Sequence, residues 1–289
     1  MPDPRTDYSP IVERTPLKLP GNASVAVWII VNVEEWPFDA PMPRTVLSPP
    51  QGRSAVPDVP NYAWHEYGMR VGFWRIKEAL DKHGIKPCIT LNASVCNSYP
   101  QIVDAMVNSR WEILGHSYTQ RPLHVEENER KIIRKSLQLI KEKTGIAPRG
   151  WLGPGLAETS NTPDILAEEG IEYVCDWVND DQPYKMKVKK GSLYSVPYSQ
   201  ELNDVPIHMV QNHRSSELYD RTRDQLETLL SEGATNARVM AIAVHPYITG
   251  VPHRIGYFNK LLTHLKQVEG VWITTGSEIL DWYKEVSSS

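Results

Sequence analysis

The sequence has no excess of positive charge, no long apolar run and few cysteines. Lys and Arg number 31 against 35 Asp and Glu, a net charge of -4, which gives no electrostatic case for nucleic-acid binding. The apolar runs have the length of strands, short of the ~20 residues that span a bilayer, and residues 1–5 lack the apolar core of a signal peptide. We therefore expect a cytoplasmic protein that binds neither nucleic acid nor membranes.

Cysteine is scarce, whereas tryptophan is abundant. Cys88, Cys96 and Cys175 are an odd number without the spacing of a metal site, and we interpret them as reduced, buried residues. The chain has nine tryptophans. Because an exposed indole is costly, we expect several of them to line a cleft or a subunit contact as well as the core. The tryptophan content therefore favours a homo-oligomer.

Strand-like apolar runs alternate with helical patterns along the chain. The strand-like runs are Val25–Val33, Pro87–Leu91, Trp111–Leu114, Ile171–Cys175, Tyr194–Pro197, Val239–Val244 and Val271–Thr274. The helical patterns are Glu66–His83, Tyr99–Ser109, Glu126–Thr144, Thr162–Glu169, Ser215–Glu232, Ile255–Val268 and Ser277–Val286. About seven repeats without a break in composition predict parallel strands in one barrel-like α/β domain over residues 25–289. The polar, proline-rich residues 1–24 predict an arm wrapped over this domain.

A long proline-rich segment follows the first predicted strand, over residues 36–64. It is too long for a simple connection, and structured loops at the carboxyl ends of strands often form active-site walls. We interpret the segment as a lid, because Trp36, Phe38, Tyr62 and Trp64 give it apolar anchors. The alternative is a disordered insertion.

Polar side chains follow four of the predicted strands. Glu34 and Glu35 follow the first, His116 the third and His245 the sixth, while residues 176–181 follow Ile171–Cys175. Neighbours on a strand point to opposite faces, but we expect the backbone to turn at the strand end so that both carboxylates reach one site. Two carboxylates and two histidines at equivalent strand ends predict an acid–base set for hydrolysis. The alternatives are a solvated strand end for the glutamates and structural roles for the histidines.

These strand ends resemble the motifs of the polysaccharide deacetylase family, which has a distorted (β/α) barrel. Asn32–Glu35 is similar to the family's T-F-D-D, 116–120 to its H-[ST]-x-x-H, and Ala243–His245 to its late strand ending in histidine. The resemblance implies that Glu34 is the general base and His245 the general acid. It also implies that Glu35 and His116 belong to a metal site.

Two departures point to one branch of that family. Gln120 stands where the second histidine ligand belongs, and an amide is a poor ligand for a transition metal. Leu152 lies near the place of the arginine in the third motif. Together with N-x-E-E, the helix entry His65–Arg75 and Cys175-Asp176, these features resemble the metal-independent allantoinases and cyclic imide hydrolases. The resemblance implies no cofactor or a weakly bound divalent metal, zinc being the candidate, on Glu35, His116 and Gln120, and an oligomer such as a tetramer.

The function expected from these residues is the opening of a small cyclic imide or ureide. Glu34 would activate the attacking water and His245 would protonate the departing nitrogen. His116, Gln120 and the backbone N–H groups of 153–155 would stabilise the oxyanion. We also expect Glu35 and Asp181 to contact the substrate. Three aromatic rings would clamp a flat substrate by stacking, those of Trp36, Trp151 and Trp177.

Other functions stay open at this point. A flat-ring clamp and hydrophobic packing under the lid account equally well for the three tryptophans. The main alternative function is a metal-dependent N-deacetylase of amino sugars or peptidoglycan fragments, with Glu35, His116 and Gln120 as a degraded set of metal ligands. A catalytically inactive barrel that serves as a binding protein is a third, against which the presence of both Glu34 and His245 argues.

Overall fold

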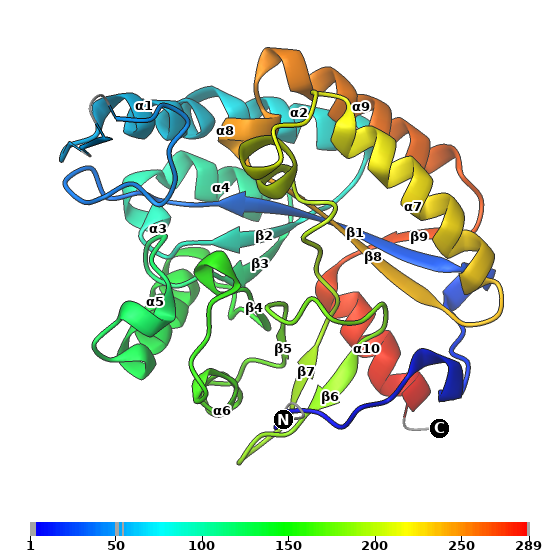
Figure 1. Cartoon of the computed structure of the whole chain (residues 1–289). Helices are drawn as coiled ribbons and strands as arrows, with labels where there is room; N and C mark the ends of the chain where they lie inside the picture. The colour runs from blue at the N-terminus through cyan, green and yellow to red at the C-terminus, as the bar shows by residue number, and fades with distance from the viewer. Residues whose placement is uncertain (1–3, 50–51, 54, 288–289) are drawn as a thin grey trace.

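The computed structural model describes residues 4–49, 52–53 and 55–287. Residues 1–3 of the predicted arm, 50, 51 and 54 of the predicted lid, and the last two residues of the predicted domain lie outside this description. In the described part, nine strands form one curved sheet with helices packed around it (Figure 1). The predicted α/β fold with a distorted barrel is therefore confirmed.

The sheet is parallel except at one edge. Its order is β6-β7-β5-β4-β3-β2-β1-β8, with β9 paired to the first half of β1, and only the β6–β7 pair is antiparallel. An isolated parallel bridge between Asn203 and Ala243 links the segment after β7 to β8, so the two ends of the sheet approach each other. The strands are β1 Val25–Val33, β2 Cys88–Leu91, β3 Glu112–Gly115, β4 Gly150–Trp151, β5 Tyr173–Val174, β6 Tyr184–Met186, β7 Leu193–Ser195, β8 Arg238–Val244 and β9 Val271–Thr274.

All seven predicted strand segments overlap a strand of the sheet, and two strands were missed. β4 has only two residues, and β6 carries a polar residue at its centre, so neither produces an apolar run. The helices are α1 Val59–Tyr67, α2 Phe73–His83, α3 Val95–Ser98, α4 Pro100–Asn108, α5 Glu129–Thr144, α6 Thr162–Glu168, α7 Glu217–Gly233, α8 Pro246–Thr249, α9 Pro252–Gln267 and α10 Gly276–Ser287. None of these described helices is long and apolar enough to cross a bilayer.

Alternate residues of β1 face two different cores. Ala26, Trp28 and Ile30 pack inside the barrel with residues of the other strands. The odd-numbered residues of β1 pack against the surrounding helices instead. This period of two is the geometry of a strand buried on both sides. It directs Asn32 and Glu34 into the barrel.

The helix predicted from Glu66 begins earlier, at Val59. Asp58 caps its first turn by accepting a hydrogen bond from the Asn61 backbone N–H, 3.3 Å away. A π-helical turn, Gly68–Gly72, joins α1 to α2. A Cβ on Gly68 would lie 2.6 Å from the Tyr247 nitrogen, and one on Gly72 would lie 2.1 Å from the Pro246 oxygen. These glycines therefore let the helix pack closely on α8, which directly follows His245.

The two terminal segments cover one end of the barrel (Figure 1). In the described part of the arm, Arg5 pairs with Asp164 at 3.0 Å and Arg14 with Asp180 at 2.6 Å. The indole N–H of Trp282 in α10 donates to the Lys18 carbonyl at 2.8 Å. These contacts fix the arm to the first turn of α6, to the segment after β5 and to α10.

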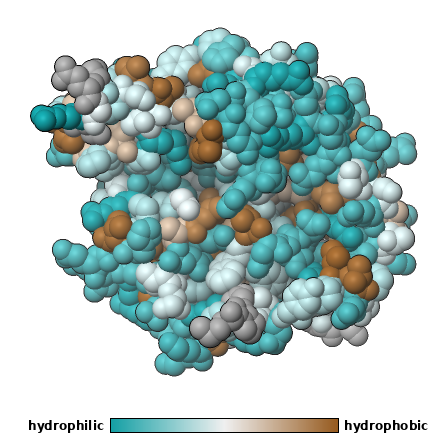
Figure 2. Space-filling view, in the orientation of Figure 1, coloured by the Kyte–Doolittle hydropathy of each residue, from teal (hydrophilic) through white to brown (hydrophobic). Residues whose placement is uncertain are grey.

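The unusual residues of the sequence lie mostly in the core. The three cysteines are reduced and buried, as predicted. Of the nine tryptophans, five are buried, namely Trp28, Trp36, Trp111, Trp151 and Trp282. Figure 2 shows polar residues over most of one face, with apolar residues in small separate patches. The tryptophan content is thus largely accounted for by the core, and the homo-oligomer stays a prediction.

Candidate active site

A cavity of about 170 Å³ lies at the carboxyl end of the barrel strands. Several strand ends and the loop after β1 contribute polar side chains to it. These are Asn32 near the end of β1, Glu34 just after it, Arg44 from the loop, His116 and Gln120 after β3, Tyr198 and Asn203 after β7, and His245 after β8. The predicted base and acid thus lie in one site, with the Glu34 Oε1 and His245 Nε2 atoms 3.3 Å apart.

Glu34 is a buried carboxylate, 2% exposed, with several donors. Its Oε2 atom accepts from the Trp36 indole N–H at 2.9 Å and the Tyr247 hydroxyl at 3.2 Å, and it lies 3.4 Å from the Arg44 guanidinium. Burial by itself raises the pKa of Glu34, but Arg44 and His245 more than offset this, and the pKa falls below its usual value. Glu34 is therefore ionised, with Oε1 turned toward His245.

His245 is held by Asp204, which sequence reasoning did not assign to the site. Asp204 accepts from His245 Nδ1 at 2.6 Å, from the His245 backbone N–H at 2.7 Å and from the Thr249 hydroxyl at 2.6 Å. Burial lowers the pKa of His245, but Asp204 and Glu34 raise it to about 8. His245 is thus protonated at neutral pH and directs Nε2–H at Glu34.

His116 has the opposite protonation. Its Nδ1 atom donates to the Leu152 carbonyl at 2.5 Å, and burial lowers its pKa. The ring is therefore neutral, and Nε2, which is buried without a partner among the described residues, carries a lone pair. This corrects the expectation of an oxyanion donor, because Nε2 of this tautomer accepts hydrogen bonds.

The backbone turn after β4 offers fewer donors than expected. The Gly153 N–H donates to Asp176 Oδ1 at 2.7 Å, and Pro154 has no N–H. Of residues 153–155, only Gly155 keeps an N–H that could face an oxyanion. The side-chain amide of Gln120, which lines the cavity, is therefore the better donor.

The residues predicted to hold a metal do not fit one. Glu35 follows the end of β1 and is not among the residues that line the cavity. Its Oε2 atom is buried without a hydrogen-bond partner among the described residues, as is Oε1 of Gln120. In the same part of the chain, no three His, Cys, Asp or Glu residues are grouped closely enough to hold a metal ion. One imidazole and one amide are a poor donor set for zinc.

The three tryptophans expected to clamp a substrate do other things. Trp36 is 1% exposed and donates to Glu34, while its ring stacks on His65 at 4.6 Å. Trp151 is fully buried between the sheet and the helices. Trp177 donates to Glu158 at 3.2 Å. None of the three lines the cavity. Trp36 packs with residues of the loop after β1, whereas Trp151 and Trp177 pack in the core around β4 and β5.

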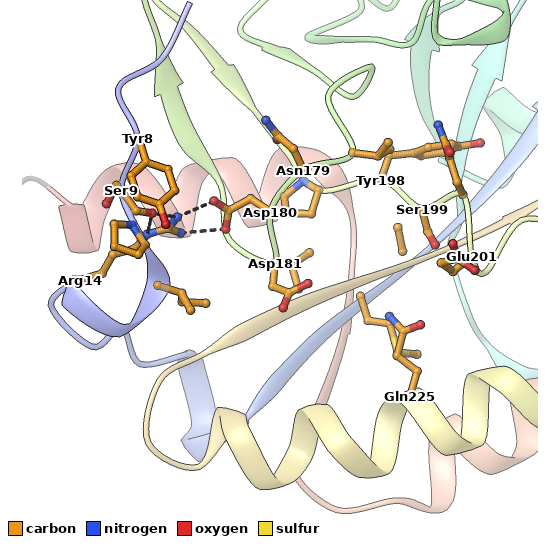
Figure 3. Close-up of a pocket in the computed structure, with 18 residues that line it drawn as sticks. Tyr8, Ser9, Arg14, Asn179, Asp180, Asp181, Tyr198, Ser199, Glu201 and Gln225 are labelled. Carbon is orange, nitrogen blue, oxygen red and sulfur yellow. Dashed lines mark hydrogen bonds and ion pairs between the residues drawn. The ribbon is translucent and has the colours of Figure 1, made fainter. Parts of the chain in front are cut away.

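Asp181 also lies away from the catalytic residues. It lines a larger pocket of about 570 Å³ between the N-terminal arm and the first half of β8 (Figure 3), which borders the active-site cavity at Tyr198 and Gln200. Its carboxylate is 3.9 Å from Arg238. Arg14 and Asp180 form an ion pair at the arm side of this pocket, as Figure 3 shows. Asp181 therefore does not contribute to the lining of the active-site cavity.

Arg44 and Tyr247 are further site residues that the sequence did not single out. Arg44 comes from the loop after β1, contacts the Tyr247 hydroxyl and lies over the Trp36 ring at 5.9 Å. Burial lowers the pKa of Arg44, whereas Tyr247 and Glu34 raise it above its usual value. Tyr247 follows His245 by two residues, and this spacing was the one available signal. Nothing in the local sequence of Arg44 indicates that it reaches Glu34.

The site can perform proton transfer on both sides of a scissile bond. An ionised carboxylate and a protonated imidazole face each other, and a neutral imidazole lies beside them as a hydrogen-bond acceptor. Such a pair suits the addition of water to a carbonyl carbon and protonation of the group that leaves.

Comparisons with known proteins show what the chain is similar to. A family model described as polysaccharide deacetylase matches residues 62–174. A Schizosaccharomyces pombe protein named as a polysaccharide deacetylase is 30% identical over 90% of this chain and 90% of its own. A peptidoglycan deacetylase of Helicobacter pylori is 22% identical over 74% of this chain and 84% of its own.

Two solved structures share the fold over nearly the whole chain. The PuuE allantoinase has a TM-score of 0.85 and 24% identity, over 98% of this chain and 100% of its own. A Pseudomonas aeruginosa PAO1 protein described as a polysaccharide deacetylase has a TM-score of 0.85 and 23% identity, over 95% of this chain and 96% of its own.

Proposed function

This chain belongs to the polysaccharide deacetylase family, and we propose that it opens a small cyclic imide or ureide by hydrolysing a C–N bond of the ring. As a member of that family it is a hydrolase. The observation that carries the proposal is the pair of Glu34 and His245, 3.3 Å apart in a cavity of about 170 Å³.

The size of the cavity limits the group that reacts beside Glu34 and His245 to a small one. Pockets that bind drug-sized ligands have volumes of roughly 300–1,000 Å³. The cavity is smaller than these, and its lining is polar on several sides. A planar ring with alternating N–H and C=O groups fits this lining, since His116 Nε2 accepts from a ring N–H and the Gln120 amide donates to a ring oxygen.

The reaction follows from the protonation of the two central residues. When a substrate and a water enter between them, Glu34 Oε1 accepts a proton from the water, whose oxygen adds to the ring carbonyl carbon. The C–N bond then breaks, and His245 Nε2 gives its proton to the departing nitrogen. Finally, the proton on Glu34 passes to His245. The net change is one water added, with OH on carbon and H on nitrogen.

The surroundings of Glu34 support its role as base. Arg44 and Tyr247 hold Oε2 and keep the carboxylate ionised. The contact with His245 is one of the causes that lower the pKa of Glu34. A ligand that breaks this contact therefore raises the proton affinity of Oε1 at the moment when the water needs a base.

A metal is not required in this proposal. Glu35 does not line the cavity, and Gln120 occupies the place of a histidine ligand, so activity should not depend on zinc. The alternative function is a metal-dependent N-deacetylase of amino sugars or peptidoglycan fragments, which the names of the curated relatives favour. It would need Glu35, His116 and Gln120 together as ligands.

The test is a substrate screen on chelated protein with matched variants. Hydantoin, succinimide and allantoin should be opened without added metal, and acetylated glucosamine oligomers should not react even with zinc. Glu34→Gln should lose about 10²–10⁴-fold in kcat while remaining folded. Glu112→Gln is the control, because this carboxylate starts β3 at the opposite end of the barrel. Full turnover by Glu34→Gln removes Glu34 from the role of base.

One variant separates the two functions. Glu35→Gln should lose much less ring-opening activity than Glu34→Gln, because the Glu35 carboxylate lies outside the cavity. Deacetylation that needs zinc and is abolished by Glu35→Gln would favour the alternative.

A further inference from the structure

A second hollow, here called the vestibule, lies next to the active-site cavity. It has a volume of about 520 Å³ and lies between the loop after β1 and the segments that follow β3 and β4. Arg44, Gln120 and Gly155 line both spaces. Because the two spaces share these residues, a ring bound in the cavity can extend a substituent into the vestibule.

Five of the eleven residues that line the vestibule are prolines. Pro37, Pro41 and Pro43 come from the loop, and Pro122 and Pro154 face them from the other side. Proline has a fixed φ and no N–H, so these residues present rigid carbon surfaces without hydrogen-bond donors. Such a wall binds an apolar group at little cost in conformational entropy.

The charges of the vestibule are already paired. Arg44 binds Glu34 and Tyr247. Arg121 donates to the Val125 carbonyl at 3.1 Å and lies 3.4 Å from Glu126. Among the described residues that line the vestibule, none is acidic. A cationic substituent would therefore meet two arginines without a carboxylate, while an anionic one would have to compete with the existing partners.

We propose that the natural substrate is a cyclic imide or ureide that carries an uncharged alkyl or aryl substituent, which the vestibule binds while the ring occupies the cavity. This inference rests on the proposed ring-opening function and names its substrate class. It also assigns a role to the loop after β1. Its Arg44 orients the catalytic carboxylate, while its prolines select the substituent.

The first experiment compares substituted rings on the unmodified protein. The substrates are hydantoin and its 5-methyl, 5-isobutyl, 5-benzyl, 5-carboxymethyl and 5-aminoethyl derivatives. We expect kcat/KM to be at least about 10-fold higher for the isobutyl and benzyl rings than for hydantoin. The aminoethyl ring should be the poorest of the series, and the carboxymethyl ring should not exceed hydantoin.

The second experiment fills the vestibule from both sides. Ala40 and Thr119 line the vestibule but not the cavity, so Ala40→Trp and Thr119→Phe should each lower the benzyl-to-hydantoin ratio of kcat/KM at least about 10-fold. Val46→Trp adds the same ring to the same loop at a position that is 54% exposed and lines neither space. This control should leave kcat/KM unchanged for both hydantoin and its benzyl derivative.

The outcomes separate this inference from the function on which it rests. Equal kcat/KM for hydantoin and its apolar derivatives, or preference for the aminoethyl ring, overturns the vestibule proposal and leaves ring opening in place. A ratio unchanged in both filled variants, with their melting temperatures preserved, also overturns it. Absence of turnover on every ring overturns the proposed function and the inference together.

Discussion

Replacing Asp204 by asparagine removes the charge that keeps His245 protonated. Asp204 is fully buried, and its two oxygens take three hydrogen bonds, two of them from His245. Asparagine has nearly the same shape, so the variant changes charge with little change of volume. The pKa of His245 should fall toward or below its ordinary value, because burial then acts with less opposition.

The size of the effect on stability follows from the pKa. His245 titrates at about 8 in the folded protein, against 6.5 as its reference value. A pKa raised by folding stabilises the protein fully below about pH 6.5, and the contribution is lost as the pH rises through about 8. About 1.5 pKa units at 1.36 kcal/mol each give about 2 kcal/mol. The wild type should therefore lose about 2 kcal/mol of unfolding free energy from this group between pH 6 and pH 9.

Two measurements test this reasoning. Urea unfolding at pH 6 and pH 9 should show that this loss is largely absent in Asp204→Asn, since the removed charge is a main cause of the raised His245 pKa. The alkaline decline of kcat/KM, expected near pH 8 when His245 loses its proton, should move to lower pH in the variant. Asp164→Asn is the matched control, because Asp164 is also buried and paired, with Arg5. An alkaline decline that stays near pH 8 in Asp204→Asn would refute the assignment of His245 as acid.

Three further predictions rest on other contacts. Treatment with a chelator should leave ring-opening activity intact, because the candidate ligands do not fit a metal, and specific recovery by zinc after such treatment would contradict this. Trp36→Phe should lower kcat about 10-fold with a smaller change in KM, because Glu34 loses a hydrogen bond of a kind worth roughly 1.5–3 kcal/mol; an unchanged kcat would show that the indole only packs. Gly115→Ala should lower the free energy of unfolding by about 1–3 kcal/mol, because the new Cβ would lie 2.6 Å from the Trp151 ring, and thermal unfolding at unchanged temperature would contradict the packing.

Much of the fold and the central pair of the site could be predicted from local patterns. β1 is a long apolar run, and its period of two places Glu34 inside the barrel. The same period predicts Glu35 on the opposite side, so the prediction that both carboxylates turn into one site ignored a signal that was present. His245 could be assigned because it directly follows β8, where parallel strands collect functional groups.

Other parts of the site have no local signature. Asp204 precedes His245 by 41 residues, in a helical turn just before Pro206–Val210, and Arg44 lies within a proline-rich loop. Tryptophans near strand ends look alike in sequence whether they line a cavity or fill the core. The oxyanion role of His116 failed because the Leu152 carbonyl fixes its tautomer, and that carbonyl belongs to another strand end.

Apolar residues recur along the chain with a period of two in the strands and near four in the helices. This pattern alone specifies the order of strands and helices and the parallel barrel. It also specifies the strand ends that bear Glu34, His116 and His245. The tertiary structure alone decided the protonation of those three residues, the partners Asp204 and Arg44, and the two adjacent spaces beside them. The physical reason is that a strand pattern depends on neighbours in the chain, whereas a pKa and a cavity depend on charges and surfaces brought together from distant segments.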